Sequence, residues 1–471
     1  MQKNQYGLII FLISIASFMG TLDATIVNIS LPSIARYFQV DLALVSWVAL
    51  MYLLILSSVL ITFGRVGDVN GYRKIYILGF AIFTIGSLCC GLSPHIYYLI
   101  GFRAVQAIGA SMLQAIGGAM IIRYLPEKKA GMAIGIMTTA AAIGLAVGTP
   151  LGGFLSQNLS WHWIFYVNIP VGIAAVIIAF IILPRDEVQK TVEKFDLLGA
   201  GSLFLALGAM IFALNMGNNF GWTSGIILAS IVVSIVMWIV FFITEKRAKN
   251  PVINLQLFKH INFTLACIVA LLIFVVTQGG FYILPFYFEL QRQLTPSIAG
   301  LILLIPSIGI MVAGPVAGAL LSRIGSRPIC IVASFLFVGA FLMLSLLGES
   351  TGLLFISIAL ALEGIAIGLM VTANFSLILF SSPSGDEGMI NSLVSTLRNM
   401  GMVMGIALFG LVFLSIVNAS GISLSDITPA NLPQSGRVPG FHATFILGTI
   451  VTVIILVLNF IVRENKKSSL K

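Results

Sequence analysis

Long apolar runs alternate with short charged or Gly/Pro-rich stretches along the whole chain. Most runs reach about 20 residues, the length that an α-helix needs to cross the hydrocarbon core of a bilayer. We therefore expect an all-α membrane protein, with connections too short to hold a soluble domain. The pattern predicts fourteen membrane-spanning helices, over residues 7–29, 43–63, 76–93, 97–121, 131–155, 162–183, 197–217, 224–243, 262–288, 297–320, 329–347, 351–380, 388–416 and 441–462.

The composition supports the same class of protein. Hydrophobic residues make up 59% of the 471 and charged residues only 9%, whereas soluble domains carry about 25% charged residues. The first apolar run is too long for a signal peptide, and no small-residue cleavage pattern follows it, so we expect it to be the first helix. The lipid bilayer is therefore the first partner that the sequence indicates.

The net charge of +9 indicates membrane orientation and not a nucleic-acid partner. If the amino terminus is cytoplasmic, Arg36, Arg292 and Arg437 lie outside the cell, and Arg103 and Arg398 lie within helices. The remaining 20 of the 25 Lys and Arg residues are then cytoplasmic, which is the positive-inside bias. We expect a multi-pass protein of the cell (inner or plasma) membrane with both termini in the cytoplasm.

A single ionisable side chain interrupts the first apolar run, Asp23 in "TLDATIVNISLP" (21–32). A carboxylate at membrane depth costs about 2.5–3.5 kcal/mol. At 1.5 Å per residue, Asp23 lies about 10 Å below the outer surface, and Arg103 in the fourth helix lies about 9 Å below it. We predict that these two charges share a level, either as a proton-exchange site or as a static ion pair.

Two further ionisable residues fall near the middle of predicted helices in the second half. Glu363 lies in the twelfth helix and Arg398 in the thirteenth. We predict that they form a second buried pair, because each would lower the cost of burying the other. A structural role and a proton-coupling role remain open for this pair.

An internal repeat divides the chain. "GRVGDVNGYR" (64–73) and "GALLSRIGSR" (318–327) share the pattern Gly-x-x-x-[Asp/Ser]-x-x-Gly-x-Arg at an offset of 254, and "LP" recurs at 31–32 and 284–285 at an offset of 253. Helices 1–6 then correspond to helices 9–14, as in transporters that rock around a central site. We predict six-helix bundles at 1–184 and 251–471, with an inserted helix pair at 185–250.

Five segments in order resemble the major facilitator superfamily, in particular its fourteen-helix group of drug–proton antiporters. The resemblance covers nearly the whole chain and implies a two-bundle transporter that exports lipophilic or cationic small molecules in exchange for protons. The segments are "LDATIVNISLP" (22–32), "GRVGDVNGYRK" (64–74), "RAVQAIGASM" (103–112), "GLAVGTPLGG" (144–153) and "WHWIFYVNIPVG" (161–172).

These segments and one aromatic stretch supply the other candidate residues. The resemblance implies a conformational latch at Gly64, Asp68, Gly71 and Arg73, in which glycines permit tight turning. It also implies a gating element in the fifth helix, where glycines allow close helix packing and a proline can kink the helix; its residues are Gly144, Gly148, Pro150, Gly152 and Gly153. Candidates for lining a cavity are Gln106, Phe281, Tyr282 and Phe286, either as an apolar site with cation–π contacts or as core or lipid-facing residues.

Other function classes lack their chemistry. The histidines are isolated, at 95, 162, 260 and 442, and the sequence has no G-x-x-x-x-G-K-[ST] loop of a primary pump. The cysteines lie within predicted helices, at 89, 90, 267 and 330, where we expect packing roles and no disulfides. We therefore expect a monomeric transporter that needs no metal or cofactor and is not an enzyme. A channel remains open, as does export of a specific metabolite, amino acid or lipid-like compound.

Overall fold

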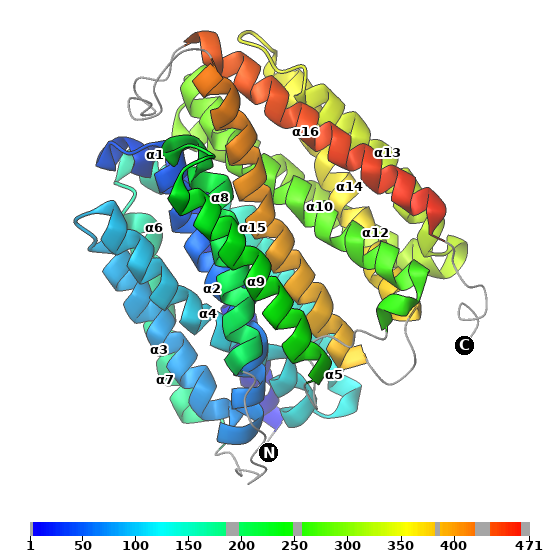
Figure 1. The fold of residues 1–471 in the computed structure, drawn as a ribbon. Coiled ribbons are helices and arrows are strands. Elements are labelled where there is room, and N and C mark those ends of the chain that lie inside the picture. Colours follow the sequence, from blue (N-terminus) through cyan, green and yellow to red (C-terminus); the bar gives the residue numbers. More distant parts are fainter. Residues whose placement is uncertain (1–2, 185–196, 248–256, 382–386, 420–433, 463–471) are drawn as a thin grey trace. The chain divides into compact units, whose positions relative to one another are not determined.

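The computed structural model describes residues 3–184, 197–247, 257–381, 387–419 and 434–462, and every regular element in these ranges is helical. The first half contains α1 (Lys3–Phe38), α2 (Leu42–Asn70), α3 (Tyr72–Gly91), α4 (Ile96–Tyr124), α5 (Glu127–Asn158), α6 (Trp163–Tyr166) and α7 (Asn168–Ile182). Then follow α8 (Leu197–Phe220), α9 (Gly225–Arg247) and the 3-10 turn η1 (Leu257–Lys259). The second half contains α10 (Ile261–Phe286), the π-helical turn η2 (Tyr287–Gln291), α11 (Pro296–Ile302), α12 (Leu304–Ile324), α13 (Ser326–Leu344), α14 (Leu353–Phe380), α15 (Glu387–Ala419) and α16 (Gln434–Ile461) (Figure 1).

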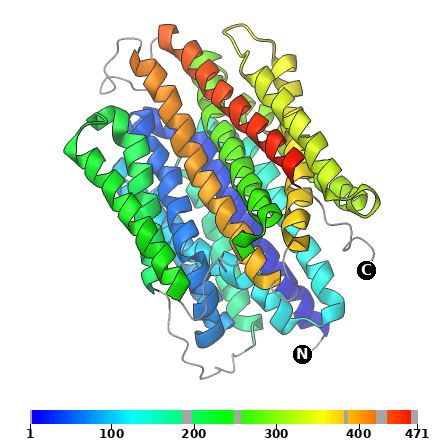
Figure 2. The same ribbon diagram turned by 45° about the vertical axis from the view of Figure 1, so that its right-hand side comes forward.

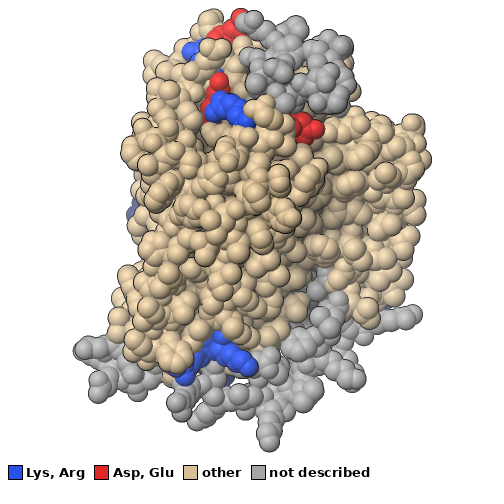
Figure 3. All heavy atoms as spheres, turned by 90° about the vertical axis from the view of Figure 1, so that its left-hand side faces the viewer, with Lys and Arg blue, Asp and Glu red and all other residues tan. Residues whose placement is uncertain are grey.

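Fourteen helical spans in the described part of the chain are long and apolar enough to cross a membrane. This number confirms the prediction from the apolar runs. On the face shown in Figure 3, most of the visible charged side chains lie toward the upper and lower parts of the view, with a wide, almost uncharged band between them. Such a band is what lipid-facing helices require, because a charged side chain in hydrocarbon is costly.

Contacts divide the chain into two compact units. Unit 1 comprises Met1–Phe38, Leu44–Phe204 and Thr295–Gly300, and unit 2 comprises Gln39–Ala43, Leu205–Leu294 and Leu301–Lys471. The division into two six-helix bundles and a separate inserted pair remains a prediction.

Helix packing within the two units repeats as the sequence repeat predicts. In unit 1, α1 packs on α5, and α3 packs on both α4 and α7. In unit 2, α10 packs on α15, and α13 packs on both α14 and α16. Counted by membrane span, each partner in unit 2 lies eight spans after its counterpart in unit 1. Five helices of the first half therefore pack in the same way as five helices of the second half.

The repeated loop motif has the same local structure in both units. Gly71 precedes α3 with φ of 94°, and Gly325 precedes α13 with φ of 83°; residues with a side chain rarely adopt such values. Arg73 Nη2 donates a hydrogen bond at 2.7 Å to a carbonyl in the last turn of α7, and Arg327 Nη2 does so at 2.7 Å in the last turn of α16. A cation is favoured at this end of a helix, where carbonyls lack helical partners.

Several helix ends differ from the sequence prediction. The first helix was expected to end at residue 29, but α1 continues through Pro32 to Phe38. The sixth and tenth apolar runs are each split, with α7 beginning after Val167 and α12 after Leu303. Both new helices carry a proline as their third residue, which removes one backbone donor to the preceding turn.

The inserted helices α8 and α9 form an antiparallel pair (Figure 2). Ser234 in α9 donates a hydrogen bond at 2.8 Å to the carbonyl of Ala206 in α8. Within unit 2, Asn218 near the end of α8 donates at 2.9 Å to Ser415 in α15. A side-chain hydrogen bond thus attaches the end of the pair to the helices of the second half.

Candidate functional site

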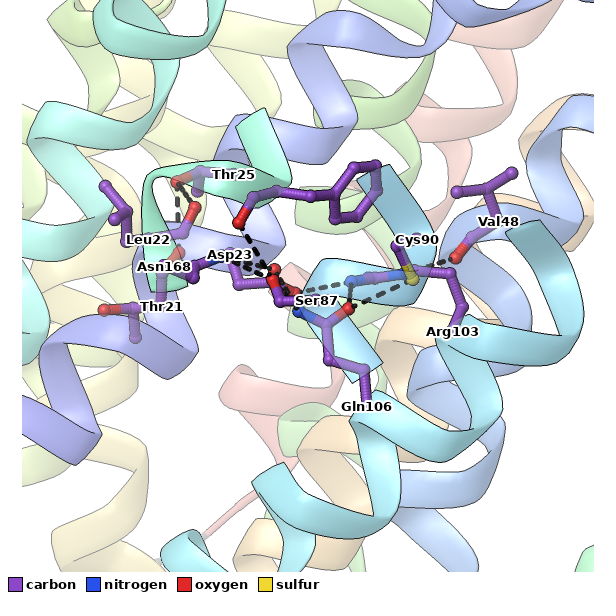
Figure 4. Close-up of polar contacts among 11 residues, drawn as sticks. Thr21, Leu22, Asp23, Thr25, Val48, Ser87, Cys90, Arg103, Gln106 and Asn168 are labelled. Atoms are coloured by element: carbon purple, nitrogen blue, oxygen red, sulfur yellow. Dashed lines mark hydrogen bonds and ion pairs between the residues drawn. The ribbon is translucent and has the colours of Figure 1, made fainter. Parts of the chain in front are cut away.

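Asp23 lies at the centre of a buried polar network in unit 1 (Figure 4). Its Oδ2 accepts a hydrogen bond from Arg103 Nη1 at 2.6 Å, and its Oδ1 accepts from Gln106 Nε2 at 2.9 Å and from Asn168 Nδ2 at 3.2 Å. The side chains of Asp23 and Arg103 are 0% and 1% exposed. The structure thus brings together the two charges that the sequence predicted to share a level.

Arg103 has further partners that do not depend on the carboxylate. Its Nη1 also donates to Gln106 Oε1 at 2.7 Å, and its Nε donates to the carbonyl of Val48 at 3.0 Å. Its guanidinium carbon lies 4.1 Å from the ring centroid of Tyr52, one turn after Val48 on α2, where an aromatic face attracts a cation. Two neutral acceptors and an aromatic ring therefore stabilise this cation in addition to Asp23.

The break between α6 and α7 positions the rest of the network. Asn168 is the first residue of α7, and its Nδ2 reaches both Asp23 and, at 3.3 Å, Ser87 Oγ. Ser87 also accepts from Gln106 at 3.0 Å and donates at 3.1 Å to the carbonyl of Phe165, just before the break. Helices α1, α3, α4 and α7 therefore enclose Asp23.

Gln106 was predicted to line a cavity, but it is a member of this network. Its side chain is 0% exposed, and both polar atoms of its amide are bonded. The sequence prediction missed Ser87 and Asn168. The signal for Asn168 was its place as a polar residue at the start of an apolar stretch, inside the quoted segment 161–172.

A row of glycines on α5 packs directly against the turns of α1 that carry Asp23. A Cβ atom on Gly144 would lie 2.5 Å from the carbonyl oxygen of Phe18, and one on Gly148 would lie 1.8 Å from Thr25 Oγ1. One on Gly152 would lie 2.8 Å from the carbonyl oxygen of Ile26. These three glycines therefore permit close helix packing, as expected for small residues in membranes.

The end of α5 packs on a different segment of unit 1. A Cβ atom on Gly153 would lie 2.2 Å from the carbonyl oxygen of Pro296, and one on Gly300 would lie 2.4 Å from that of Thr149. Pro150 lies inside α5, which continues to Asn158. A gating role of Pro150 and its neighbours remains a prediction.

The candidate latch is described in part. Arg73 binds the last turn of α7, and Gly71 has the positive φ given above. A Cβ atom on Gly64 would meet no atom of the described residues within 4 Å, so close packing against them does not require this glycine. The side chain of Asp68 lies outside the described part of the chain, and its role as a latch therefore remains a prediction.

Glu363 and Arg398 do not form the predicted pair in the described structure. Neither carboxyl oxygen of Glu363 has a hydrogen-bond partner among the described residues, and its side chain is 0% exposed. A Cβ atom on Gly280 of α10 would lie 3.5 Å from Glu363 Oε1. Arg398 of α15 instead lines a cavity together with Phe274, which also belongs to α10. Six residues separate these levels, or about 9 Å along α10, so the prediction of a pair was wrong.

The aromatic candidates of α10 are core residues in this structure. Phe281 is 7% exposed, Tyr282 1% and Phe286 0%. Tyr282 donates at 3.2 Å to the carbonyl of Leu42, which belongs to the same unit, and its ring centroid lies 5.5 Å from that of Phe286. The cavity described in unit 2 is lined by none of the three.

In unit 2, two glycines of α15 that the sequence prediction missed permit close helix packing, as the α5 glycines do in unit 1. A Cβ atom on Gly401 of α15 would lie 2.5 Å from the carbonyl oxygen of Leu271, and one on Gly405 would lie 2.3 Å from that of Val275. Their spacing, "GMVMG" at 401–405, is the G-x-x-x-G pattern of closely packed membrane helices.

Comparison with protein families agrees with the fold and the repeat. A model described as "Major Facilitator Superfamily" matches residues 13–196, 197–406 and 296–471. The chain belongs to this superfamily. Its members are secondary transporters, so the protein is a multi-pass membrane transporter of small molecules and not an enzyme.

Curated relatives within the superfamily are about 30% identical. The riboflavin transporter RibZ of Clostridioides difficile is 31% identical over 87% of this chain and 89% of its own length. The multidrug resistance protein Stp of Mycobacterium tuberculosis is 31% identical over 86% and 75%. The multidrug transporter protein MdtP of Bacillus subtilis is 29% identical over 90% and 78%. These relatives agree with the fourteen-helix drug–proton antiporter group that the motifs resemble.

Solved structures share the fold at low sequence identity. A bacterial homologue of the human lysosomal transporter Spinster gives a TM-score of 0.66 at 17% identity, with 98% of each chain covered. The peptide transporter POT in complex with sulfate gives 0.68 at 14% identity, with 96% of this chain and 94% of that chain covered. At these identities the likeness establishes the major facilitator fold alone.

Proposed function

We propose that this protein is a proton-coupled secondary exporter of lipophilic or cationic small molecules, which works by alternating access. The observation that carries the proposal is the enclosed Asp23 in unit 1, bonded to Arg103, Gln106 and Asn168. An ionisable residue kept at membrane depth is expensive and is expected to be functional.

Asp23 is the proton-exchange site in this proposal. Its side chain is 0% exposed, so exchange requires a movement that admits water to the network. Protonation would remove the counter-charge of Arg103, but Gln106 Oε1, the Val48 carbonyl and the Tyr52 ring would still stabilise the cation. The network can therefore hold Arg103 in both protonation states of Asp23, which a merely static ion pair would not need.

Glu363 is the second proposed proton site. Its two carboxyl oxygens have no described partner, and an unpartnered carboxylate anion is far more costly to bury than a carboxylic acid. We therefore propose that Glu363 holds a proton in this conformation and releases it in another. Arg398 then belongs to substrate binding and not to a pair with Glu363.

The remaining parts of the proposal concern movement and placement. The loop with Gly64, Asp68, Gly71 and Arg73 would act as the cytoplasmic latch, and the glycine row of α5 would support gating. We further propose that the protein is a monomer in the cell membrane with both termini in the cytoplasm, as the Lys and Arg distribution indicates.

A second candidate function is export of a specific metabolite, amino acid or lipid-like compound. The observation that favours it is the similarity to a protein named a riboflavin transporter, at 31% identity. Both candidates use the same fold and the same proton site, so the substrate distinguishes them.

Transport by purified protein in proteoliposomes tests the proposal. With an acidic lumen, we expect accumulation of a lipophilic cation such as ethidium together with a rise in lumenal pH, because each transported molecule should exchange for protons. Protein-free liposomes and liposomes treated with a protonophore serve as controls. Accumulation that ignores the pH gradient would contradict proton coupling, and a screen of neutral and anionic compounds in the same assay separates the two candidate functions.

A further inference from the structure

Unit 2 contains a cavity of about 320 Å³ between α10, α14 and α15. Its size falls at the lower end of ligand pockets, which measure about 300–1,000 Å³. It therefore has room for one aromatic ring system and a polar group. The lining residues that bear on its chemistry are Phe274, Thr372, Asn374, Phe375, Ser395 and Arg398.

We propose that this cavity is a substrate subsite in which Arg398 binds an anionic oxygen group of an amphipathic aromatic molecule. The proposal rests on the proposed transport function and narrows its substrates. Within the proposed range of lipophilic substrates, this subsite favours organic anions and zwitterions, whereas a lipophilic cation would have to bind elsewhere in the protein.

The state of Arg398 is the first reason. Its side chain is half-buried, and it makes no ion pair or hydrogen bond with any other residue that the structure describes. Glu363 of α14, the acid expected to neutralise Arg398, lies close to Gly280 of α10 and therefore at a different depth along that helix. A cation at membrane depth normally has a counter-charge, and here an anionic ligand can supply it.

Asn374 supplies a second polar atom. It is 2% exposed, and its Nδ2 donates at 3.0 Å to the carbonyl of Ala266, while its Oδ1 has no described partner. A buried acceptor without a donor is costly. Asn374 lines the same cavity as Arg398. A ligand with an anionic oxygen and an N–H or O–H group would match the cation of Arg398 and, once the side chain of Asn374 turns toward the cavity, its unpaired Oδ1.

The apolar lining completes the match. Phe274 of α10 and Phe375 of α14 line the same cavity as the polar residues, and aromatic rings stack on planar ligands. A cationic ligand in this space would be repelled by Arg398 in a medium of low dielectric constant. The lining therefore fits an aromatic anion better than an aromatic cation of the same size.

Equilibrium binding of three probes of one shape tests the proposal on the purified full-length protein in nanodiscs, without any pH gradient. The probes are radiolabelled 1-naphthoate (anion), methyl 1-naphthoate (neutral) and 1-naphthylmethylamine (cation). We expect 1-naphthoate to bind at least tenfold more tightly than the other two. Arg398→Gln should weaken naphthoate binding at least tenfold, and Arg398→Lys should retain part of the affinity because it keeps the charge.

Arg323→Gln is the matched control, since it removes an exposed Arg from the same unit and should leave binding unchanged. If Arg398→Gln does not fold, Arg398→Lys and Asn374→Leu test the subsite instead. Both variants should bind naphthoate more weakly while they elute normally in size-exclusion chromatography, which shows that they are folded. Equal binding of acid, ester and amine, or unchanged affinity in the Arg398 variants, would overturn the subsite. Because no gradient is used, loss of this result leaves proton coupling intact, and failure of pH-driven transport leaves the subsite intact.

Discussion

At the residue scale, the partners of Asp23 and Arg103 are unequal. Among the described residues, Asp23 accepts hydrogen bonds from side chains alone, whereas Arg103 also binds a backbone carbonyl and an aromatic face. Breaking a buried ion pair costs about 3–5 kcal/mol when one charge is left uncompensated. The geometry around Arg103 limits that cost, as the proposed change of charge at Asp23 requires.

The planar guanidinium is required for this arrangement, so Arg103→Lys should destabilise the protein. A lysine keeps the charge but cannot reach Asp23, Gln106 and the Val48 carbonyl together, and we expect a loss of about 1–3 kcal/mol in the free energy of unfolding. The measurement is thermal unfolding in detergent. The control is Arg123→Lys, the same change at an exposed position on the same helix. Equal melting temperatures for the two variants would contradict the role of the planar Arg103 guanidinium.

At the element scale, rows of glycines set the distance between helices α1 and α5 in unit 1 and between α10 and α15 in unit 2. Each row faces backbone carbonyl groups, which cannot rotate away as a side chain can. The row in unit 1 also fixes the turns of α1 on either side of Asp23. Helix packing and the position of Asp23 are therefore coupled through α1.

A single methyl group should test this packing. Gly144→Ala and Gly405→Ala place Cβ atoms 2.5 Å and 2.3 Å from carbonyl oxygens, and overpacking of this kind typically costs about 1–3 kcal/mol. Gly135→Ala, on α5 with nothing within 4 Å, should be neutral or slightly stabilising because alanine favours helix. Thermal unfolding of the three variants measures the difference, and a melting temperature for Gly144→Ala no lower than that for Gly135→Ala would refute the close contact.

Most of the membrane-spanning helices could be predicted from the sequence, and the features that were missed have physical causes. Apolar runs predict spans well because bilayer thickness fixes helix length. Pro32 was expected to follow a helix end, yet α1 continues through it, because membrane helices tolerate proline when neighbours satisfy the freed backbone groups. Ser87 and Asn168 were missed because small polar residues in membrane helices often bond only to their own backbone.

Pairing between helices was harder to predict from the sequence. Asp23 and Arg103 were found by comparing depths in helices near one surface, and the structure places them in contact. Glu363 and Arg398 each lie near the middle of a predicted helix, but position along a helix gives neither its rotation nor its shift against a neighbour. The structure shows that they are apart because Glu363 lies near Gly280 of α10, whereas Arg398 shares a cavity with Phe274 of the same helix α10.

At the scale of the whole molecule, two units with the same helix packing carry different chemistry. Unit 1 holds an ion-paired acid, whereas unit 2 holds Glu363 and Arg398 apart. If Asp23 alone exchanges one proton for one monovalent cation, no net charge moves, and the pH difference supplies about 1.4 kcal/mol per unit. A second proton at Glu363 would add the membrane potential, about 2.3 kcal/mol per 100 mV.

The proposed orientation predicts where each connection lies. Reporter fusions after Lys129 and Lys259 should be cytoplasmic, and a fusion after Gly436 should be external, since positively charged connections remain inside. Alkaline phosphatase, active only outside, and green fluorescent protein, fluorescent only inside, give opposite readings at each site. An external reporter after Lys129 or Lys259 would contradict the orientation.

Uphill export by Asp23→Asn, compared with Glu363→Gln in the same proteoliposomes, tests the central claim most directly. Both changes replace a fully buried carboxyl group with an amide that cannot exchange a proton, and the substrate is one that the wild-type protein accumulates. We predict that Asp23→Asn abolishes accumulation driven by pH while retaining substrate exchange without a gradient, which shows that the variant is folded. Glu363→Gln should keep accumulation driven by pH and lose only its dependence on membrane potential. Accumulation by Asp23→Asn at the wild-type rate would contradict the account.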